Sequence, residues 1–569
     1  MRTLDWIILI ASLVFIVVYG IWKGRGSKDI KGYLLANRSL KWYTIALSIM
    51  ATQASAITFL STPGQAYVDG MRFVQFYFGL PIAMVILCIT AIPIYNKLNV
   101  YTAYEYLESR FDYKTRALAS FLFLIQRGLA AGLTIYAPSI ILSVILGWDI
   151  YWTNIIVGIL VISYTASGGT KAVNMTHFYQ MLIIMMGMLS ALYIVIKLLP
   201  SDISLMDAAH IAGKMGKLNT IDLKFDLSNR YNIWSGILGG LFLQLSYFGT
   251  DQSQVQRYLT GESIAQSRLG LLFNGFIKIP MQFYILFLGA MVFVFYQFEQ
   301  PPLFFNSVES DQIKSSIYAK QYENLEIEHS RIFSEKQENI RSLLDAIEAG
   351  NANQIQTAEE KLGISQEEFN NLHNSAVSLL QKNNPDLDPS DTNYIFLTFV
   401  VCFLPVGLVG LVIAAIIAAS MSSTSGELNA LAATTVVDIY RRAIKKEGSE
   451  KHYVIISKLA TLIWGIYAIF LAVYASRLGS LIEAVNILGS LFYGTILGIF
   501  LVAFYGKSIS GTATFYAAII AELVVVICFF FTDITFLWYN VIGCIGVILL
   551  AFIFNPLANS KNANRPSSK

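Results

Sequence analysis

Charged residues are scarce in this sequence, because Asp, Glu, Lys and Arg make up only 14% of its 569 residues. Soluble globular proteins carry about 25%. The few charges are segregated and leave long apolar runs of the ~20 residues that a membrane-crossing helix needs. This pattern excludes a water-soluble enzyme. The formal net charge of +3 is too small to indicate a nucleic-acid partner.

Catalytic and metal-binding patterns are missing as well. The four cysteines lie inside apolar runs without metal-ligand spacing, and the five histidines are dispersed. The sequence has no phosphate-binding P-loop and no nucleophile motif. These absences argue against an enzyme, against a resident cofactor and against a transporter that hydrolyses ATP itself.

Thirteen apolar runs are predicted to be transmembrane helices, so the expected fold class is an all-α polytopic membrane protein. The second and seventh runs are weaker than the others, because small and polar residues interrupt them. The thirteen runs lie near residues 4–22, 42–61, 73–95, 117–146, 149–167, 174–199, 231–249, 269–298, 392–420, 453–475, 480–505, 512–531 and 534–555.

Lys and Arg are distributed unequally between the two sets of short loops. The loops after the odd-numbered spans carry most of them, including the basic stretch 441–451 and the tail 556–569. The positive-inside rule then predicts an N-terminus outside and a cytoplasmic C-terminus. The expected location is therefore a plasma (inner) membrane, which the chain crosses many times.

Residues 299–391 form the one long polar segment and are predominantly acidic. Apolar residues recur sparsely between 330 and 383, which predicts one or two amphipathic helices outside the membrane. We expect this extracytoplasmic insert to be a solvated elaboration of the bundle. The alternative is a docking site for an extracytoplasmic partner.

Residues 413–426 begin as an apolar helix and end in a cluster of hydroxyls. Hydroxyl and carbonyl oxygens are the ligands that a hard, weakly polarising cation requires. The alternative interpretation is that these side chains bond back to carbonyls of their own helix and hold neighbouring helices together. The hydroxyls belong to Ser420, Ser422, Ser423, Thr424 and Ser425.

The second and seventh spans both look discontinuous. Residues 48–64 mix polar and apolar side chains, and Pro63-Gly64 is expected to break the helix. Residues 243–257 are apolar as far as Gly249 and then polar without a turn signal. Broken helices inside a membrane should line a cavity or an ion, and a separation of five spans is typical of an inverted repeat. For the second span, the alternative is an unbroken packing helix.

Two charged residues fall inside apolar runs, Arg127 in the fourth span and Lys278 in the eighth. Intramembrane charges are costly and should face a cavity or a partner. Glu483, at the start of the eleventh span, is a candidate partner for one of them. A structural ion pair or an interfacial position is favoured for Arg127 and Glu483, whereas Lys278 is as well suited to a functional role.

Over nearly all of residues 1–555 except the insert, the sequence resembles the sodium:solute symporter family. The resemblance implies two inverted five-helix repeats, at 42–199 and 231–505, flanked by the first span and the last two. It also implies sodium-driven solute uptake by alternating access. The segments that carry it are 92–95 with 105–107, 164–173, 247–257, 418–425, 437–440 and the second span.

The family's principal sodium site, transferred position by position, would use five oxygens from two helices. They are the carbonyls of Ala51, Ala54 and Ala419 and the hydroxyls of Ser422 and Ser423.

Family members with a second sodium site use an Asp and hydroxyls that His177 and Gly426 replace here. Without that Asp and one of those hydroxyls, Ser425 is expected to be structural. We therefore expect one transported sodium ion per substrate.

The resemblance also indicates where the solute binds. Tyr247 matches an inner-gate aromatic and Lys278 a sugar-contacting Lys, but Tyr77 stands where sugar carriers have Glu. Lys278 and an apparent shortage of buried carboxylates favour an anionic or hydroxyl-rich solute. Alternatives are a proton-coupled or facilitative carrier of the same fold, or a membrane sensor module. The predicted substrate-binding residues are Gln53, Thr58, Gln75, Tyr247 and Lys278.

Overall fold

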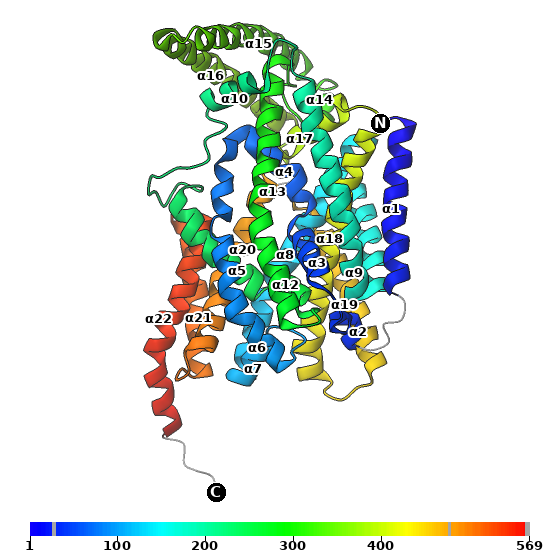
Figure 1. Ribbon diagram of the computed structural model, residues 1–569, viewed down its shortest axis with the longest axis vertical. Helices are drawn as coiled ribbons and strands as arrows, with labels where there is room; N and C mark the ends of the chain where they lie inside the picture. Colours follow the sequence, from blue (N-terminus) through cyan, green and yellow to red (C-terminus); the bar gives the residue numbers. More distant parts are fainter. Residues whose placement is uncertain (25–29, 476–478, 564–569) are drawn as a thin grey trace.

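The computed structural model describes residues 1–24, 30–475 and 479–563, and these residues form helices and connecting loops without a strand element. Most helices run roughly along one direction and form a bundle (Figure 1). From the N-terminus to the acidic insert the elements are α1 (Thr3–Gly24), α2 (Ile30–Leu35), η1 (Ala36–Arg38), α3 (Trp42–Gln53), α4 (Ala56–Asp69), η2 (Gly70–Tyr77), α5 (Leu80–Ile89), α6 (Ala91–Leu98), α7 (Glu105–Arg110), α8 (Tyr113–Leu146), α9 (Ile150–Lys197), α10 (Leu205–Lys214), η3 (Ser235–Gly239), α11 (Gly240–Gly249), α12 (Gln252–Leu259) and α13 (Ile264–Phe298).

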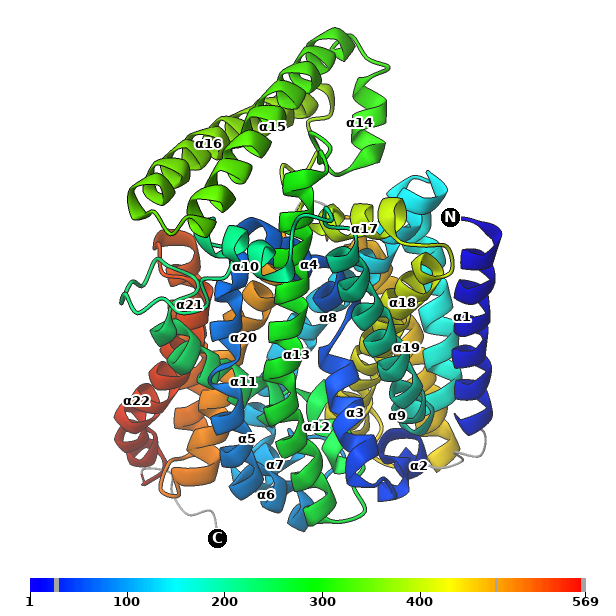
Figure 2. The same cartoon turned by 45° about the horizontal axis from the view of Figure 1, so that its top comes forward.

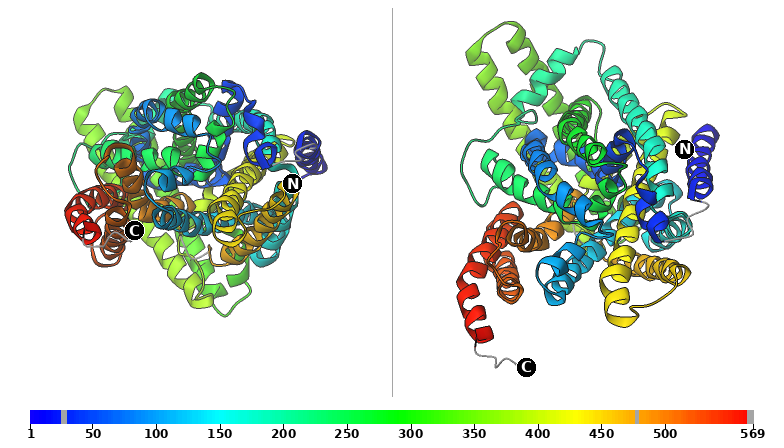
Figure 3. Two further views of the ribbon diagram at one scale, coloured as in Figure 1. Left: turned by 90° about the horizontal axis from the view of Figure 1, so that it is seen from below. Right: turned by 60° about the horizontal axis from the view of Figure 1, so that its bottom comes forward.

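The remaining elements are the insert and the C-terminal part of the bundle. Figure 3 shows α1 and the last two helices at opposite edges of the bundle. These elements are α14 (Ser307–Ile313), α15 (Ala319–Glu348), α16 (Ala352–Asn383), α17 (Thr392–Phe403), α18 (Leu408–Thr434), η4 (Thr435–Ile444), α19 (Glu450–Ala472), α20 (Leu481–Tyr505), α21 (Gly511–Phe531) and α22 (Phe536–Ala563).

The all-α polytopic architecture is confirmed. Among the described residues, ten helical stretches are long and apolar enough to cross a membrane. The predicted fifth span appears as a shorter apolar helix, residues 150–163, and the ninth is divided between α17 and α18. The second and seventh spans do not appear as spans of their own, because their helices are interrupted. Their low apolarity in the sequence reflects these interruptions.

The second span breaks at Ala54 and Ser55, between α3 and α4, where the backbone becomes extended (Ser55 φ −75°, ψ 172°). The predicted break at Pro63-Gly64 is wrong, since α4 continues through both residues. Their role is close packing. A Cβ on Gly64 would stand 1.9 Å from the Thr392 carbonyl oxygen, so the glycine lets α17 approach α4.

The seventh span breaks at Thr250 and Asp251, between α11 and α12. Asp251 has extended backbone (φ −76°, ψ 118°), and its carboxylate caps α12 by accepting a hydrogen bond from the Ser253 amide at 2.8 Å. The polar residues after Gly249 therefore belong to a second, short helix. This interruption was predicted from the sequence.

Helix α9 has 48 residues, which would measure about 72 Å if it were straight. Both of its ends nevertheless lie beside the insert. Asp149 shares a cavity with Glu309, and Asp202 pairs with Arg341 at 3.3 Å. Its two apolar stretches therefore cross the bundle in opposite directions, as predicted for the fifth and sixth spans.

The insert is a helical hairpin of α15 and α16, preceded by the short helix α14. Figure 2 shows the hairpin above the end of the bundle where α4, α10 and α17 lie. Buried Ile332, Leu372 and Leu380 belong to a small separate core. Two amphipathic helices are thus confirmed, although the first begins earlier than the sequence predicted.

The C-terminus differs from the expected tail at 556–569. Helix α22 continues to Ala563, past Asn555 and Pro556. Residues 564–569 lie outside the described part of the chain. The division of the bundle into two inverted repeats stays a prediction.

Candidate functional site

The break in α3–α4 lies against the middle of α18. The Ser422 hydroxyl is 3.0 Å from the Ala51 carbonyl oxygen and 2.7 Å from the Ala419 carbonyl oxygen. The Ser423 hydroxyl is 3.1 Å from the Ala419 carbonyl oxygen. Ala54 ends α3 with non-helical backbone (φ −86°, ψ 72°), so its carbonyl leaves the helical hydrogen-bond pattern.

The five residues predicted to hold sodium are therefore all at this junction, and all are buried. Their oxygens are hydroxyls and carbonyls without a carboxylate, which suits a monovalent ion that must leave again. Ser425 instead bonds back to the Ser422 carbonyl at 3.0 Å. The sodium ligand set stays a prediction.

The position where the resemblance places a second sodium site contains His177 and lies beside Arg257. The His177 ring nitrogens lie 3.0 Å from the Ser48 hydroxyl and 3.2 Å from the Ser422 carbonyl oxygen. A Cβ on Gly426 would stand 3.7 Å from a guanidinium nitrogen of Arg257. A guanidinium at this distance disfavours a cation. The number of sodium sites stays a prediction.

A cavity of about 80 Å³ lies between the two helix breaks. Of the predicted substrate residues, Gln53, Thr58 and Tyr247 line it. Sequence reasoning did not find several further polar lining residues, among them Gln126, Gln244 and Glu427. The cavity thus brings together residues from α3, α4, α8, α11, α18 and α20.

Gln75 and Lys278 do not line this cavity. Gln75 donates to the Tyr231 carbonyl at 3.0 Å and accepts from the Asp222 amide at 3.1 Å, so it fastens the loop before η3. Lys278 is fully buried, and its ammonium lies 5.6 Å from the centre of the Tyr77 ring. Tyr77 lines the cavity, so Lys278 lies behind that ring.

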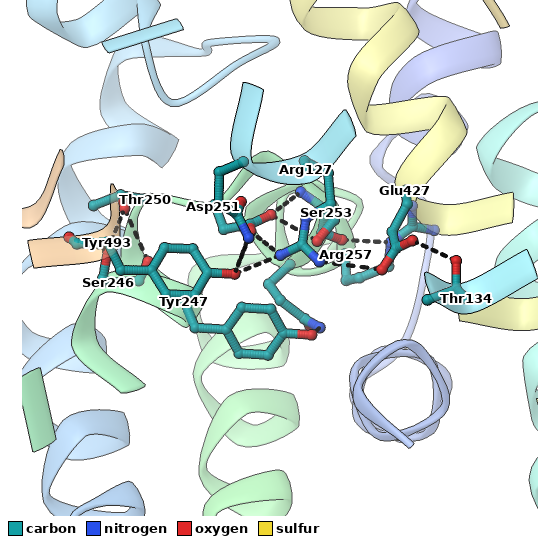
Figure 4. Close-up of polar contacts among 12 residues, drawn as sticks. Arg127, Thr134, Ser246, Tyr247, Thr250, Asp251, Ser253, Arg257, Glu427 and Tyr493 are labelled. Atoms are coloured by element: carbon teal, nitrogen blue, oxygen red, sulfur yellow. Dashed lines mark hydrogen bonds and ion pairs between the residues drawn. The ribbon is translucent and has the colours of Figure 1, made fainter. Parts of the chain in front are cut away.

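A buried ion-pair network forms one wall of the cavity, and Figure 4 shows its members close together. They come from α8, α18, α20 and the α11–α12 break. The Arg127 guanidinium pairs with Asp251 and, at 3.1 Å, with Glu427. The Tyr493 hydroxyl lies 2.6 Å from Arg127 and donates to Asp251 at 2.9 Å. Thr134 donates to Glu427 at 2.9 Å. One guanidinium thus faces two carboxylates, and each of the three charges has a neighbour of opposite sign.

Arg127 and Glu483 both lie in ion pairs, as favoured from the sequence. Two other sequence-based expectations are wrong. Glu483 pairs with Arg230 at 2.7 Å, near the surface, and not with Arg127 or Lys278. Buried carboxylates are present, since Asp251 and Glu427 are 1% and 4% exposed. Both lie in mixed polar stretches of the sequence, so neither was recognised as intramembrane.

Tyr247 covers one side of the cavity. Its hydroxyl accepts a hydrogen bond from Gln254 at 2.6 Å, and the Arg127 guanidinium lies 5.5 Å from its ring centre. Its ring also packs against Tyr493, with 5.9 Å between ring centres. Tyr247 is therefore held by both the broken helix and the ion-pair network.

Several amide groups beside the cavity lack a hydrogen-bond partner within the described part of the chain. They are Oε1 of Gln53, Oε1 of Gln126, and both polar atoms of Gln244. Buried amide groups without partners are costly, so they mark where a ligand would bond. The cavity wall therefore contains charged groups that have partners of opposite charge and neutral amide groups that lack hydrogen-bond partners.

On the end of the bundle opposite the insert, a second ion-pair network connects α7, α8 and η4. Arg116 bonds Asp438 and Glu108, both at 2.8 Å, and Glu108 also accepts from Arg442 at 2.7 Å. Thr102 donates to Asp438 at 2.8 Å. These contacts hold the three elements together at that end of the bundle.

A membrane bundle with two broken helices around a central polar cavity has the architecture of a secondary transporter. The model of the sodium:solute symporter family matches residues 33–306 and 386–521. The chain belongs to this family. The matched residues leave out 307–385, which form most of the insert.

Curated relatives agree with this assignment. The chain is 32% identical over 273 residues to human sodium-coupled monocarboxylate transporter 1, covering 48% of this chain and 44% of that protein. It is 29% identical over 309 residues to the human sodium/iodide cotransporter, covering 54% and 48%. The matches thus span about half the length of these relatives.

Two further similarities extend over the whole chain. The sodium/sialic acid symporter SiaT of Proteus mirabilis (strain HI4320) is 23% identical over 571 residues, covering 97% of this chain and 95% of that protein. A solved structure of a Na+-coupled sialic acid symporter, in a substrate-bound outward-open state, superposes with a TM-score of 0.75. It is 22% identical and covers 98% of both chains, so the two proteins share a fold.

Proposed function

We propose that this chain is a sodium-driven symporter that imports a small polar solute by alternating access, with one sodium ion per substrate. Sodium is the transported coupling ion in this proposal, and no resident cofactor is required. The N-terminus and the insert face the outside of the plasma (inner) membrane. A proton-coupled or facilitative carrier is the competing function.

The observation that carries the proposal is the junction between the α3–α4 break and α18. The Ser422 hydroxyl lies within hydrogen-bond distance of carbonyl oxygens on both segments, Ala51 at 3.0 Å and Ala419 at 2.7 Å. A cation at this junction would bond both segments at once. Its binding energy would therefore depend on their relative position, which is the differential affinity that coupling requires.

The cavity wall supports a neutral solute over an anionic one. Arg127 already faces two carboxylates, so it offers no free positive charge to an anion. The amides of Gln53, Gln126 and Gln244 remain open. Hydroxyl or amide groups of a solute would satisfy them, and a site built for such bonds rejects analogues that lack them.

The test is sodium-dependent stability of the purified full chain, measured as the melting temperature in NaCl and in choline chloride at equal ionic strength. At a sodium concentration 100-fold above its Kd, binding adds about 2.7 kcal/mol to stability. We expect this increase in the wild type and its loss in the double variant Ser422→Ala/Ser423→Ala. Ser425→Ala is the matched control, because Ser425 bonds only within its own helix here.

A sodium response that persists in the double variant would show that the assigned site is wrong. The substrate class is tested by adding neutral polyols, amides and carboxylates in either salt. We expect sodium-dependent stabilisation from a neutral solute, and proteoliposome uptake of that solute driven by a sodium gradient. Uptake driven equally by a proton gradient without sodium would establish the competing function.

A further inference from the structure

A second cavity, of about 420 Å³, lies between the helical hairpin of the insert and the adjacent end of the bundle. Figure 2 shows the hairpin over this end. The bundle contributes residues from α4, α13 and the loop after α10, and the insert contributes residues from α15 and α16. The cavity is separate from the sodium junction and shares no lining residue with the central cavity.

Two ammonium groups lie at this cavity without an acidic partner. Lys336 of α15 is 2% exposed, and its Nζ lies 4.7 Å from the ring centre of Phe369 and 5.9 Å from that of Phe293. Lys217 Nζ lies 4.7 Å from the same Phe293 ring and donates to the Val68 carbonyl. Within the described ranges, neither lysine forms a salt bridge.

Contacts with aromatic rings replace only part of the hydration that a buried ammonium loses. Burial, together with the nearby charge of Lys217, accordingly lowers the pKa of Lys336 to about 7. Burial also lowers the pKa of Lys217 to about 8. Two like charges against one ring would both be stabilised by an anion between or beside them.

The other titratable groups at this cavity do not supply that anion. Asp391 accepts a hydrogen bond from the Phe305 amide at 2.8 Å and faces His373 at 3.9 Å. His329 is buried, and burial lowers its pKa to about 4, so it is neutral near pH 7. Asp69, beyond the cavity edge, acts on Lys217 only as a secondary influence. At pH 6.5, below the pKa of both lysines, the cavity therefore carries an excess of positive charge.

We propose that this cavity binds a small organic carboxylate, whose charge is neutralised by Lys336 and Lys217 and whose apolar body packs against the aromatic wall. That wall consists of Tyr67, Phe293, Tyr296, Phe305 and Phe369. The carboxylate joins the insert to the bundle, because Lys336 and Lys217 come from the two different parts.

The site is a property of the insert. Lys336 and Phe369 lie in the stretch 307–385 that the family model does not match. The carboxylate site is therefore additional to sodium coupling and to the solute cavity. It provides a way for an external carboxylate to change how firmly the insert is held to the bundle.

The test is calorimetric titration of the purified full chain at pH 6.5 with benzoate, and with benzamide as the neutral analogue. We expect benzoate to bind and benzamide to bind at least ten-fold more weakly. Lys336→Met should weaken benzoate binding at least ten-fold, and Lys217→Met, in a different segment, should also weaken it. Lys361→Met, at an exposed position of α16, is the matched control and should leave the Kd unchanged.

Raising the pH to 9 should weaken benzoate binding at least ten-fold, because both lysines then lose their protons. Tyr247→Ala, which alters only the central cavity, should leave the Kd unchanged. The proposal is overturned if benzoate does not bind at millimolar concentration, if benzamide binds equally well, or if both lysine variants keep the wild-type Kd. Loss of binding in Tyr247→Ala alone would place benzoate in the central cavity and would also overturn it.

Discussion

Two regions of this protein bury cationic side chains in different ways. In the central cavity, Arg127 faces Asp251, Glu427 and the Tyr493 hydroxyl. Beneath the insert, Lys336 faces the rings of Phe293 and Phe369. The guanidinium is neutralised by the protein itself, whereas the ammonium is not.

The difference shows what each region does. A buried charge with well-placed partners fixes the positions of the segments that carry them, here α8, α18 and the α11–α12 break. A buried charge without such partners costs stability in the free protein, so a ligand of opposite charge binds there with a gain. The central network therefore organises the solute cavity, and the insert cavity is suited to bind an anion.

Arg127→Met should have the largest effect on stability and tests the region whose buried cation has acidic partners. The variant leaves Asp251 and Glu427 buried without their cation, and breaking a buried pair in this way costs about 3–5 kcal/mol. We expect a large decrease in melting temperature in detergent and loss of solute binding. Arg230→Met is the control, because the Arg230 side chain is 56% exposed and a pair with an exposed partner contributes about 0–1 kcal/mol. Equal effects of the two variants would contradict the assigned role of the central network.

Much of the fold could be predicted from the sequence, because membrane helices follow hydropathy closely. The interruptions in the second and seventh spans were also visible as polar residues in weak apolar runs. The position of the first break was not visible in the sequence. Pro63 predicted a break at residues 63–64, whereas the chain breaks at Ala54 and Ser55. Gly64 instead packs against Thr392 of α17, and such a tertiary contact cannot be predicted from local sequence.

Less of the candidate site than of the fold could be predicted from the sequence. The resemblance to a family, and not the spacing of these residues in the sequence, predicted that Ser422 and Ser423 lie opposite Ala51. The partners of Arg127 lie 124 and 300 positions away in the chain, so no local pattern could connect them. The sequence did contain one indication that Glu427 faces the site. Ser420, Ser423 and Glu427 recur at helical spacing and would share one face of α18.

Lys336→Met tests the region whose buried cation has no acidic partner, and the variant should stabilise the protein. The pKa of Lys336 is about 7 in the folded chain against 10.5 as the ordinary value. Between these values the unfolded chain binds more protons, so the free energy of unfolding of the wild type rises with pH. We expect the variant to be more stable at pH 7 by roughly 1–3 kcal/mol, and to lose part of this rise.

The measurement is thermal melting followed by circular dichroism between pH 6.5 and 10, in a buffer without carboxylates. Lys217 contributes a similar, smaller rise above pH 8, which remains in the variant. Lys361→Met serves again as the control and should follow the wild type. If Lys336→Met lowers stability at pH 7, the ammonium is satisfied by the protein and the comparison fails.

Lys214→Met should have the smallest effect. It extends the comparison from buried cations to an exposed ion pair. Lys214 of α10 pairs with Glu359 of α16 at 2.6 Å, so it also connects bundle and insert, but both side chains are more than one-third exposed. Such pairs contribute about 0.2–1 kcal/mol and are screened by salt. A double-mutant cycle with Glu359→Gln measures the coupling, which should disappear in 1 M salt. A coupling larger than the effect of Lys336→Met would mean that surface pairs, and not the charge balance of the cavity, determine how the insert is held.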